Sequence, residues 1–172
     1  MIIRSELKED YDPVYQLNVI AFNNRSDEAD LVNRIRRSDG FVPALSLVAE
    51  LNGQIVGHIL LSKIEIVNDH NVTLALALAP MVVISEVQNQ GIGTSLVREG
   101  LKRCLGLGYK IVVVIGHPWF YPKFVFKSAR DYGLECHQYK VSDDVFMVAE
   151  LEKDALDGVH GVVRYPESFA GV

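Results

Sequence analysis

The sequence is poor in several features that would mark particular classes of protein. It has only two cysteines in 172 residues, and Cys104 and Cys136 fit neither a disulfide framework nor a zinc motif. Its most apolar segment, residues 72–84, is interrupted by Thr73 and Pro80 and is shorter than the roughly 20 residues that a membrane-spanning helix needs. The N-terminal segment becomes charged at once, so we expect no signal peptide. These absences predict a soluble, cytoplasmic protein.

The chain also lacks an excess of basic residues. Its 17 lysines and arginines are outnumbered by 22 acidic residues, and the net charge is -5. A protein of this charge has no general attraction for phosphate backbones. The local cluster of Arg34, Arg36 and Arg37 is more simply explained as the solvated face of a helix. We therefore expect neither nucleic acid nor a membrane among the partners.

The histidines lack the spacing of metal ligands, so we expect no metal site; they include His58, His70, His137 and His160. What the chain does have is an ordinary globular composition, with 49% hydrophobic and 23% charged residues and a mean hydropathy of +0.14. Its length fits one domain of usual size. We expect residues 1–172 to form a single domain, with a C-terminal tail from about residue 153.

Apolar periodicity predicts an alternation of helices and strands along the chain. Two helices follow a short first strand, and the hairpin dipeptide Asn52-Gly53 then marks an antiparallel meander. A third helix connects the meander to a strand of five consecutive aliphatic residues, which implies a parallel pairing with a right-handed crossover. The expected ranges are strand 2–3, helices 10–22 and 26–40, strands 45–51, 54–67 and 72–84, helix 91–106 and strand 110–116.

The last third of the chain has a weaker pattern. Residues 117–126 form an aromatic-rich turn and short helix, and 134–139 and 145–151 are expected to close the sheet as an antiparallel pair. Pro80 cannot donate a ladder hydrogen bond, so it predicts a bulge or a splaying of strands nearby. The whole pattern predicts an α+β fold, with a mixed, mostly antiparallel sheet of about seven strands flanked by helices.

The segment 88–95 lies between a strand and a helix and contains two glycines. Gly91 and Gly93 permit a close approach of the backbone, and the free N–H groups at a helix start bind phosphate. A Walker A loop is excluded because no Gly-Lys-Ser/Thr follows. A dinucleotide fingerprint is excluded because Leu96 stands where its third glycine is required. By itself, the pair of glycines is equally consistent with a helix start that binds nothing.

The order of motifs resembles the GNAT superfamily of N-acetyltransferases over nearly the whole chain. The resemblance is carried by the Gln-x-x-Gly-x-Gly run of residues 88–93, which follows the proline-marked strand, and by the segment 121–126, which follows the buried strand. It extends to residues 46–50, 52–53 and 56–59. The resemblance implies a GNAT-like fold and acetyl-CoA as cosubstrate. One residue departs from the family pattern, since Val125 replaces the glycine of a Gly-Phe pair.

The resemblance also implies roles for particular residues. Backbone N–H groups from Gln90 to Ser95 would hold the pyrophosphate, and the bulged strand would pair with the pantetheine arm. An N–H group at the bulge would polarise the thioester carbonyl. The cofactor-binding residues implied in this way are Met81, Val82, Val83, Gln88, Asn89, Gln90, Gly91, Ile92, Gly93, Thr94, Ser95 and Phe124.

Tyr121 would protonate the departing CoA thiolate, because a tyrosine stays protonated near neutral pH. Its alternative role is a packed aromatic of the core. Three residues are candidates for the base, and each has a simpler explanation. Glu28 would be a helix cap or dipole partner, Glu86 a surface acid, and His117 the anchor of a turn. Water alone is a further option.

Together these features predict an N-acetyltransferase that moves an acetyl group from acetyl-CoA to a primary amine. Transfer is expected to be direct, because neither cysteine lies next to the cofactor motif. The sequence does not identify the acceptor amine, and a homodimer is compatible with the resemblance. The rival hypothesis is a non-catalytic acetyl-CoA-binding sensor or interaction module on the same fold.

Overall fold

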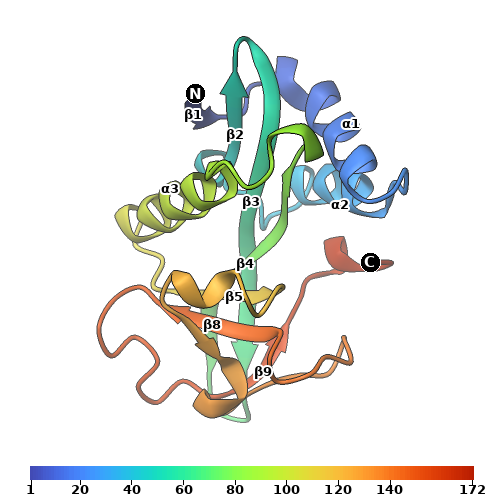
Figure 1. The fold of residues 1–172 in the computed structure, drawn as a ribbon. Coiled ribbons are helices and arrows are strands. Elements are labelled where there is room, and N and C mark those ends of the chain that lie inside the picture. Colours follow the sequence, from blue (N-terminus) through green and yellow to red (C-terminus); the bar gives the residue numbers. More distant parts are fainter.

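The computed structural model describes residues 1–172 and contains three α-helices and one sheet of nine strands (Figure 1). The helices are α1 (Tyr11–Ala21), α2 (Asp27–Arg36) and α3 (Ile92–Gly106). The strands are β1 (Ile2–Ser5), β2 (Ser46–Leu51), β3 (Gln54–Val67), β4 (Val72–Val83), β5 (Ile111–Ile115), β6 (Phe126–Ser128), β7 (Leu134–Cys136), β8 (Phe146–Glu150) and β9 (Gly161–Arg164). Short 3₁₀ helices lie between several of these elements.

The sheet is mixed and mostly antiparallel, as expected. Its strands follow the order β1-β2-β3-β4-β5-β8-β6, while β9 pairs with β3 and β7. Only the β4–β5 and β7–β9 pairs are parallel. The β2–β3 hairpin turns at Asn52 and Gly53, whose φ angles of 51° and 78° are both positive. Two positive φ angles in succession are what a tight two-residue hairpin requires, and Asn and Gly tolerate them best.

The three helices cover opposite faces of the sheet, with α1 and α2 on one face and α3 on the other (Figure 1). Side chains alternate along β3, so Leu60 and Ile64 join one core cluster with residues of α1 and α2. Ile59 and Leu61 join the other cluster, with residues of α3. The alternation in the sequence therefore produces two cores, one on each side of the sheet.

The sheet opens where β4 meets β5. These strands share only two paired positions, Leu76 with Val112 and Ala77 with Val113. Beyond them, β5 continues alongside β8, and both lie at a steep angle to β3 and β4 (Figure 1). The register of β3 and β4 also shifts between Ile59 and Leu61, opposite Pro80. The bulge and splay expected from this proline are thus confirmed.

The C-terminal third differs most from the expectation. The strands at 134–136 and 146–150 do not pair with each other, so the predicted closing pair is wrong: β7 pairs with β9 in parallel, and β8 lies between β5 and β6. The short helix expected in 117–126 is a 3₁₀ turn, Tyr121–Lys123. Strands β6 and β9 raise the number of strands from about seven to nine.

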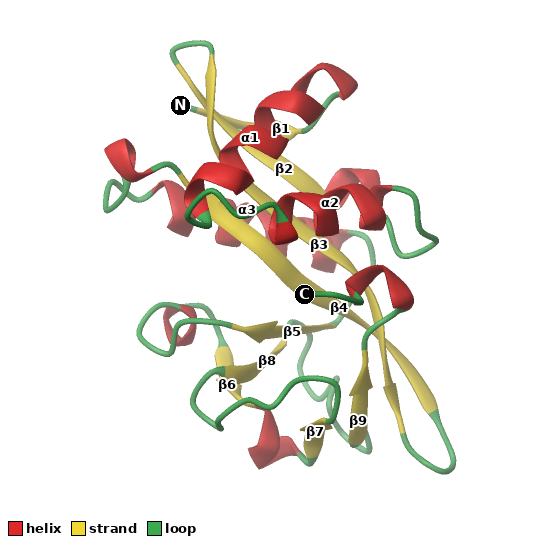
Figure 2. Cartoon of the chain, turned by 90° about the vertical axis from the view of Figure 1, so that its right-hand side faces the viewer, coloured by secondary structure: helices red, strands yellow, loops and turns green.

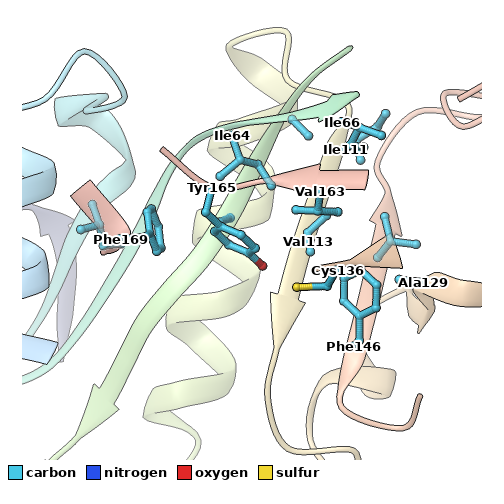
Figure 3. Packing of buried hydrophobic residues seen from close by; sticks show 14 of the residues in the cluster. Ile64, Ile66, Ile111, Val113, Ala129, Cys136, Phe146, Val163, Tyr165 and Phe169 are labelled. Carbon is cyan, nitrogen blue, oxygen red and sulfur yellow. The ribbon is translucent and has the colours of Figure 1, made fainter. Parts of the chain in front are cut away.

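The residues beyond 153 are packed into the molecule. They contain β9 and a 3₁₀ helix, Glu167–Phe169. The side chains of Val163 and Tyr165 point into the core on the side of Cys136, and Phe169 packs against Tyr165 (Figure 3). This C-terminal segment runs back to α2, where the Arg34 Nε donates a hydrogen bond to the Ser168 carbonyl at 2.8 Å. None of the helices combines the length and apolar character needed to cross a membrane.

Candidate active site

A pocket of about 840 Å³ lies where the sheet opens. Its walls come from the end of β4, the start of α3, the segment after β5, and the facing ends of α1 and α2. The turned view shows β4 running above β5 and β8, which diverge from it (Figure 2). An opening between parallel strands at their carboxyl ends is a common location for ligand sites in sheets of this kind.

The start of α3 presents a row of free backbone donors to this pocket. Gly91 caps the helix in the left-handed conformation, with φ 85°, and no side chain caps it. The first N–H group bonded inside the helix is that of Ser95, which donates to the Gly91 carbonyl at 3.0 Å. The N–H groups of residues 89–94 donate to no acceptor in the chain. Six unpaired donors at the positive end of a helix are an arrangement that favours the binding of an anion.

A side chain fastens this loop to the strand before it. The Gln88 Nε2 donates to the Val83 carbonyl at 2.9 Å, which fixes the loop relative to the last residue of β4. Asn89 has a φ of 62°, a conformation that asparagine adopts more readily than most residues. The polar residues at 88 and 89 therefore shape the loop, whereas backbone groups would make the ligand contacts.

The end of β4 has a free hydrogen-bonding edge. The Ile84 N–H donates to the Val56 carbonyl of β3 at 2.9 Å. Because groups alternate along an antiparallel ladder, those of Val82 also face β3, and those of Met81 and Val83 face the open side. The backbone groups of Met81 and the N–H group of Val83 are therefore available to an extended ligand that adds as a strand, whereas the Val83 carbonyl already accepts from Gln88.

Tyr121 is held by packing alone. Its side chain is only 6% exposed, and its ring meets Phe120 and Phe126 edge-on at centroid distances of 5.0 and 5.6 Å. A Cβ atom on Gly116 would lie 2.4 Å from Tyr121 Cε2, so the ring lies directly on the glycine. The hydroxyl makes no hydrogen bond in the chain. Burial raises the pKa of Tyr121 above its ordinary value, which keeps the phenol protonated.

Of the three candidate bases, the structure places two in the pocket and one outside it. Glu28, near the start of α2, lines the pocket, and burial, reinforced by the charge of Asp27, raises the pKa of its carboxyl group. His117 lines the pocket too, and its ring stacks on Trp119 with centroids 4.6 Å apart. Glu86 lies outside the pocket, is exposed, and accepts a hydrogen bond from the Ser85 hydroxyl at 3.1 Å.

Comparison with known proteins agrees with this geometry. Residues 5–119 match the model of the Acetyltransferase (GNAT) family. Two Escherichia coli proteins named as uncharacterized N-acetyltransferases are similar to the chain. YhbS is 32% identical over 169 residues, which cover 98% of each protein. YjhQ is 36% identical over 127 residues, which cover 73% of this chain and 70% of YjhQ. The chain belongs to the GNAT family.

Solved structures of GNAT proteins share its fold. The crystal structure of Escherichia coli YhbS in complex with CoA superposes with a TM-score of 0.89, at 31% identity, over 98% of this chain and 91% of that protein. A GNAT acetyltransferase from Brucella melitensis in complex with acetyl-CoA gives a TM-score of 0.78, at 28% identity, over 98% of this chain and 97% of that protein. The expected GNAT fold is thereby confirmed.

Most of the residues expected at a GNAT cofactor site line the pocket, but three do not: Gln90, Ser95 and Phe124. Gln90 still contributes one of the free N–H groups, whereas the N–H of Ser95 is used inside the helix. Phe124 is only 5% exposed and packs edge-on against Phe120, with centroids 5.1 Å apart. Its position is that of a core residue beneath the pocket.

Several pocket residues were not predicted from the sequence. Phe22 reaches the pocket from the end of α1, and Gly116, Trp119 and Lys123 from the segment that follows β5. Trp119 is the clearest of them, because 71% of it is exposed although it is the largest apolar side chain in the region. The sequence offers one signal for it, the break at 116–118 that ends the buried strand.

Val125, the residue that departs from the family pattern, has a backbone conformation that suits glycine. Its φ is 53°, in the left-handed region where a glycine would be unstrained. A branched side chain there is sterically unfavourable, and the surrounding structure enforces it. The turn that follows Tyr121 therefore has a cost in stability at this residue.

Proposed function

We propose that this protein transfers an acetyl group from acetyl-CoA to a primary amine by direct attack within the pocket at the start of α3. The observation that carries the proposal is the row of free N–H groups at 89–94 beside the free edge of β4, with Tyr121 lining the same pocket. The CoA and acetyl-CoA complexes of the relatives support it. We take residues 1–172 as one acetyltransferase domain, since the C-terminal segment packs against α2.

The cofactor would be bound mainly by backbone groups. The pyrophosphate would accept hydrogen bonds from residues 89–94, and Lys123, the only lysine or arginine of the pocket wall, would add a positive charge. The pantetheine arm would pair, as an added strand, with the backbone groups of Met81 and the N–H group of Val83. Its thioester would then lie in the pocket that Tyr121 also lines.

The transfer step needs one nucleophile and two proton movements. The neutral amine nitrogen attacks the thioester carbonyl carbon, and a C–N bond forms while the oxygen becomes negatively charged; an N–H group of the β4 edge would stabilise this charge. The C–S bond then breaks, the sulfur leaves as a thiolate, and Tyr121 gives it a proton. The nitrogen loses its extra proton to Glu28, whose raised pKa suits a base.

Desolvation explains how a tyrosine with a raised pKa can still act as the donor. The same burial that favours the neutral phenol also disfavours a free thiolate in the pocket, so the affinity of the sulfur for a proton rises as well. An acyl-enzyme route has no support, because both cysteines are buried and neither lines the pocket. Burial raises the pKa of Cys104 to about 12, which keeps it an unreactive thiol.

Two measurements on the purified chain test the proposal. Acetyl-CoA at one hundred times its Kd should stabilise the folded protein by about 2.7 kcal/mol, seen as a rise in Tm. Release of the CoA thiol should then accelerate when a suitable primary amine is added. Binding without acceleration by any amine would identify the non-catalytic acetyl-CoA-binding module instead. The absence of binding by folded protein would eliminate both functions.

A further inference from the structure

Aromatic side chains from two parts of the chain line the pocket. Phe22 lines it from the end of α1, and His117 and Trp119 line it from the segment after β5. Phe120 of the same segment lies next to the α3 loop, since a Cβ atom on Gly93 would be 3.6 Å from its Cζ. Phe22, His117 and Trp119 belong neither to that loop nor to the free edge of β4, so we expect them to face the acceptor rather than the cofactor.

Trp119 and His117 form a flat surface within this wall. Their rings are nearly parallel, with an interplanar angle of 24° and centroids 4.6 Å apart. Each ring covers one face of the other, and Trp119 still remains 71% exposed. A tryptophan stacked on one side and open on the other offers a rigid planar surface, and flat apolar groups bind such surfaces by offset stacking.

The pocket wall contains few charged side chains. Glu28 is the only acidic residue among those that line the pocket. Lys123 is the only lysine or arginine, and the phosphates of the cofactor would engage it. The acceptor end therefore holds a single carboxylate, which matches one ammonium group. A polycation would need several carboxylates, and an additional negative group on the acceptor would have no free cation to meet.

We infer that the acceptor is a primary amine carried on a planar apolar body with no second charge, an amine of the arylalkyl type. This inference rests on the proposed function. The ammonium group would approach Glu28 and reach the thioester as a neutral amine after giving its first proton to solvent, which leaves Glu28 to accept the second proton during transfer. The planar body would lie against the outer face of Trp119, with Phe22 contributing to the same wall. The single carboxylate would thus recognise the ammonium end of the acceptor, and the stacked rings would recognise its planar end.

A panel of acceptors tests the charge and shape requirements together. The amines are 2-phenylethylamine, 2-cyclohexylethylamine, phenylalanine, spermidine and a short lysine peptide, each assayed by thiol release from acetyl-CoA. We expect 2-phenylethylamine to have the highest kcat/KM of the five. The cyclohexyl analogue keeps the apolar body and removes the planarity, and phenylalanine keeps the ring and adds a carboxylate. A higher kcat/KM for spermidine or the peptide would overturn the inference while leaving the acetyltransferase function in place.

A variant then assigns the preference to the tryptophan. Trp119→Ala should raise the KM for 2-phenylethylamine by about two- to tenfold, the range expected for one aromatic stacking contact. Its KM for acetyl-CoA should not change, and Trp119→Phe should recover part of the loss. Leu107→Ala is the matched control, since Leu107 is 51% exposed and lies outside the pocket.

The possible failures are distinguishable. An unchanged amine KM in Trp119→Ala, with 2-phenylethylamine still the best acceptor, would overturn the role of the stacked wall. Binding of acetyl-CoA without acceleration by any of the five amines, or by a wider set of primary amines, would overturn the proposed function and this inference with it.

Discussion

At the scale of single residues, Val125 is strained where its neighbours are not. Its φ of 53° lies in the left-handed region, which costs an L-residue about 1–2 kcal/mol. Because Val125 is 59% exposed, its side chain contributes little burial in return. Replacing it by glycine removes the steric cost, although the greater freedom of glycine in the unfolded chain takes back part of the gain. We expect Val125→Gly to raise the free energy of unfolding by about 1 kcal/mol, measured by urea denaturation.

Val72 provides a control for this substitution. It is also 59% exposed, but it lies in β4, where its backbone is extended and pairs with Val67. The change Val72→Gly should therefore destabilise the protein, by up to about 1 kcal/mol. A loss of stability in both variants would show that position 125 carries no strain that glycine relieves.

Gly116 and Tyr121 are in direct contact, so a substitution of either residue tests the role proposed for the tyrosine hydroxyl. Tyr121→Phe keeps the ring on the glycine and removes the hydroxyl, so kcat should fall by at least about tenfold with the KM for acetyl-CoA unchanged. Gly116→Ala would place a methyl group within 2.4 Å of Cε2 of the ring and displace it. We expect a comparable fall in kcat from that variant, measured at saturating amine.

The double variant shows whether Gly116 acts through the hydroxyl. If it only positions Tyr121, then Gly116→Ala should lower kcat in the natural protein and have little effect in the Tyr121→Phe background, because the group it positions is already gone. Full additivity of the two losses would mean that Gly116 has a separate role. Unchanged turnover in Tyr121→Phe would show that Tyr121 is only a packed aromatic residue of the core.

At the scale of the element, the start of α3 has two roles, to begin a stable helix and, in the proposed function, to bind the phosphates of CoA. One substitution separates them. A Cβ atom at Gly93 would have its nearest neighbour at 3.6 Å, so a side chain fits there. Gly93→Asp places a carboxylate among the free N–H groups, where it would stabilise the helix by about 0.3–1 kcal/mol and compete with the phosphates of CoA. We expect an unchanged or slightly raised Tm without ligand, and no measurable binding of acetyl-CoA by calorimetry.

Asparagine separates charge from size at the same position. Gly93→Asn has nearly the volume of the aspartate but no negative charge, so it should weaken binding of acetyl-CoA less. Equal losses from the two variants would mean that bulk, rather than charge, blocks the site. Undiminished affinity in Gly93→Asp would show that the loop is only a helix start.

The elements that the sequence predicts well are those whose signals are local. The three α-helices and the 45–84 meander repeat their apolar residues over many positions, and Asn52-Gly53 marks the turn itself. Strands β7 and β9 have three and four residues, and the more than twenty residues between them include β8, so no local pattern in the sequence indicates their pairing. The strong pattern at 145–151 gives a strand correctly, but its partners β5 and β6 are chosen by packing.

The same distinction applies to the site. The glycine loop is recognisable because helix starts and phosphate contacts require particular residues at adjacent positions. The separation of Glu28 from Glu86 follows from tertiary placement alone, since each is an acid in the first turn of a helical segment. Phe22 and Trp119 are almost one hundred residues apart in the sequence, and only the folded chain brings both to the pocket.

At the scale of the whole molecule, the C-terminal segment packs back against α2. Tyr165 and Phe169 join the core cluster that also contains Leu31 and Ile35 of α2 (Figure 3). The Tyr139 hydroxyl donates to the Phe169 carbonyl at 3.3 Å, and Arg34 holds the neighbouring Ser168. Since α2 also carries Glu28, these contacts help to hold the helix on which the candidate base lies.

A buried polar cluster links the N-terminal strands to α2. His58 of β3 is fully buried, and its Nε2 lies 3.1 Å from the Ser46 hydroxyl. That hydroxyl donates to Glu6 at 2.7 Å, and Glu6 in turn receives two hydrogen bonds from Arg36 of α2. The His58 Nδ1 has no partner in the chain. A second ring proton would therefore be buried without an acceptor.

This arrangement predicts an acid-sensitive fold. The pKa of His58 is lowered to about 4, mainly by burial; the charge of Glu6 opposes the shift, and that of Arg36 adds to it. An unfolded histidine has a pKa near 6.5, so between pH 6.5 and 4 the unfolded chain binds more protons than the folded one. The free energy of unfolding must then fall as the pH falls, by roughly 3 kcal/mol in total.

The substitution His58→Gln tests this coupling, because an amide can keep the hydrogen bond to Ser46 but does not titrate. We expect urea midpoints of the natural protein to decrease steeply between pH 6.5 and 5, and those of the variant to change much less over the same range, whatever its stability at pH 7.5. Carboxylates held by cations, such as Asp10 beside Arg4, add their own loss only nearer and below pH 4, because that pairing lowers the pKa of Asp10. Parallel pH profiles for the two proteins would show that His58 does not carry the acid sensitivity.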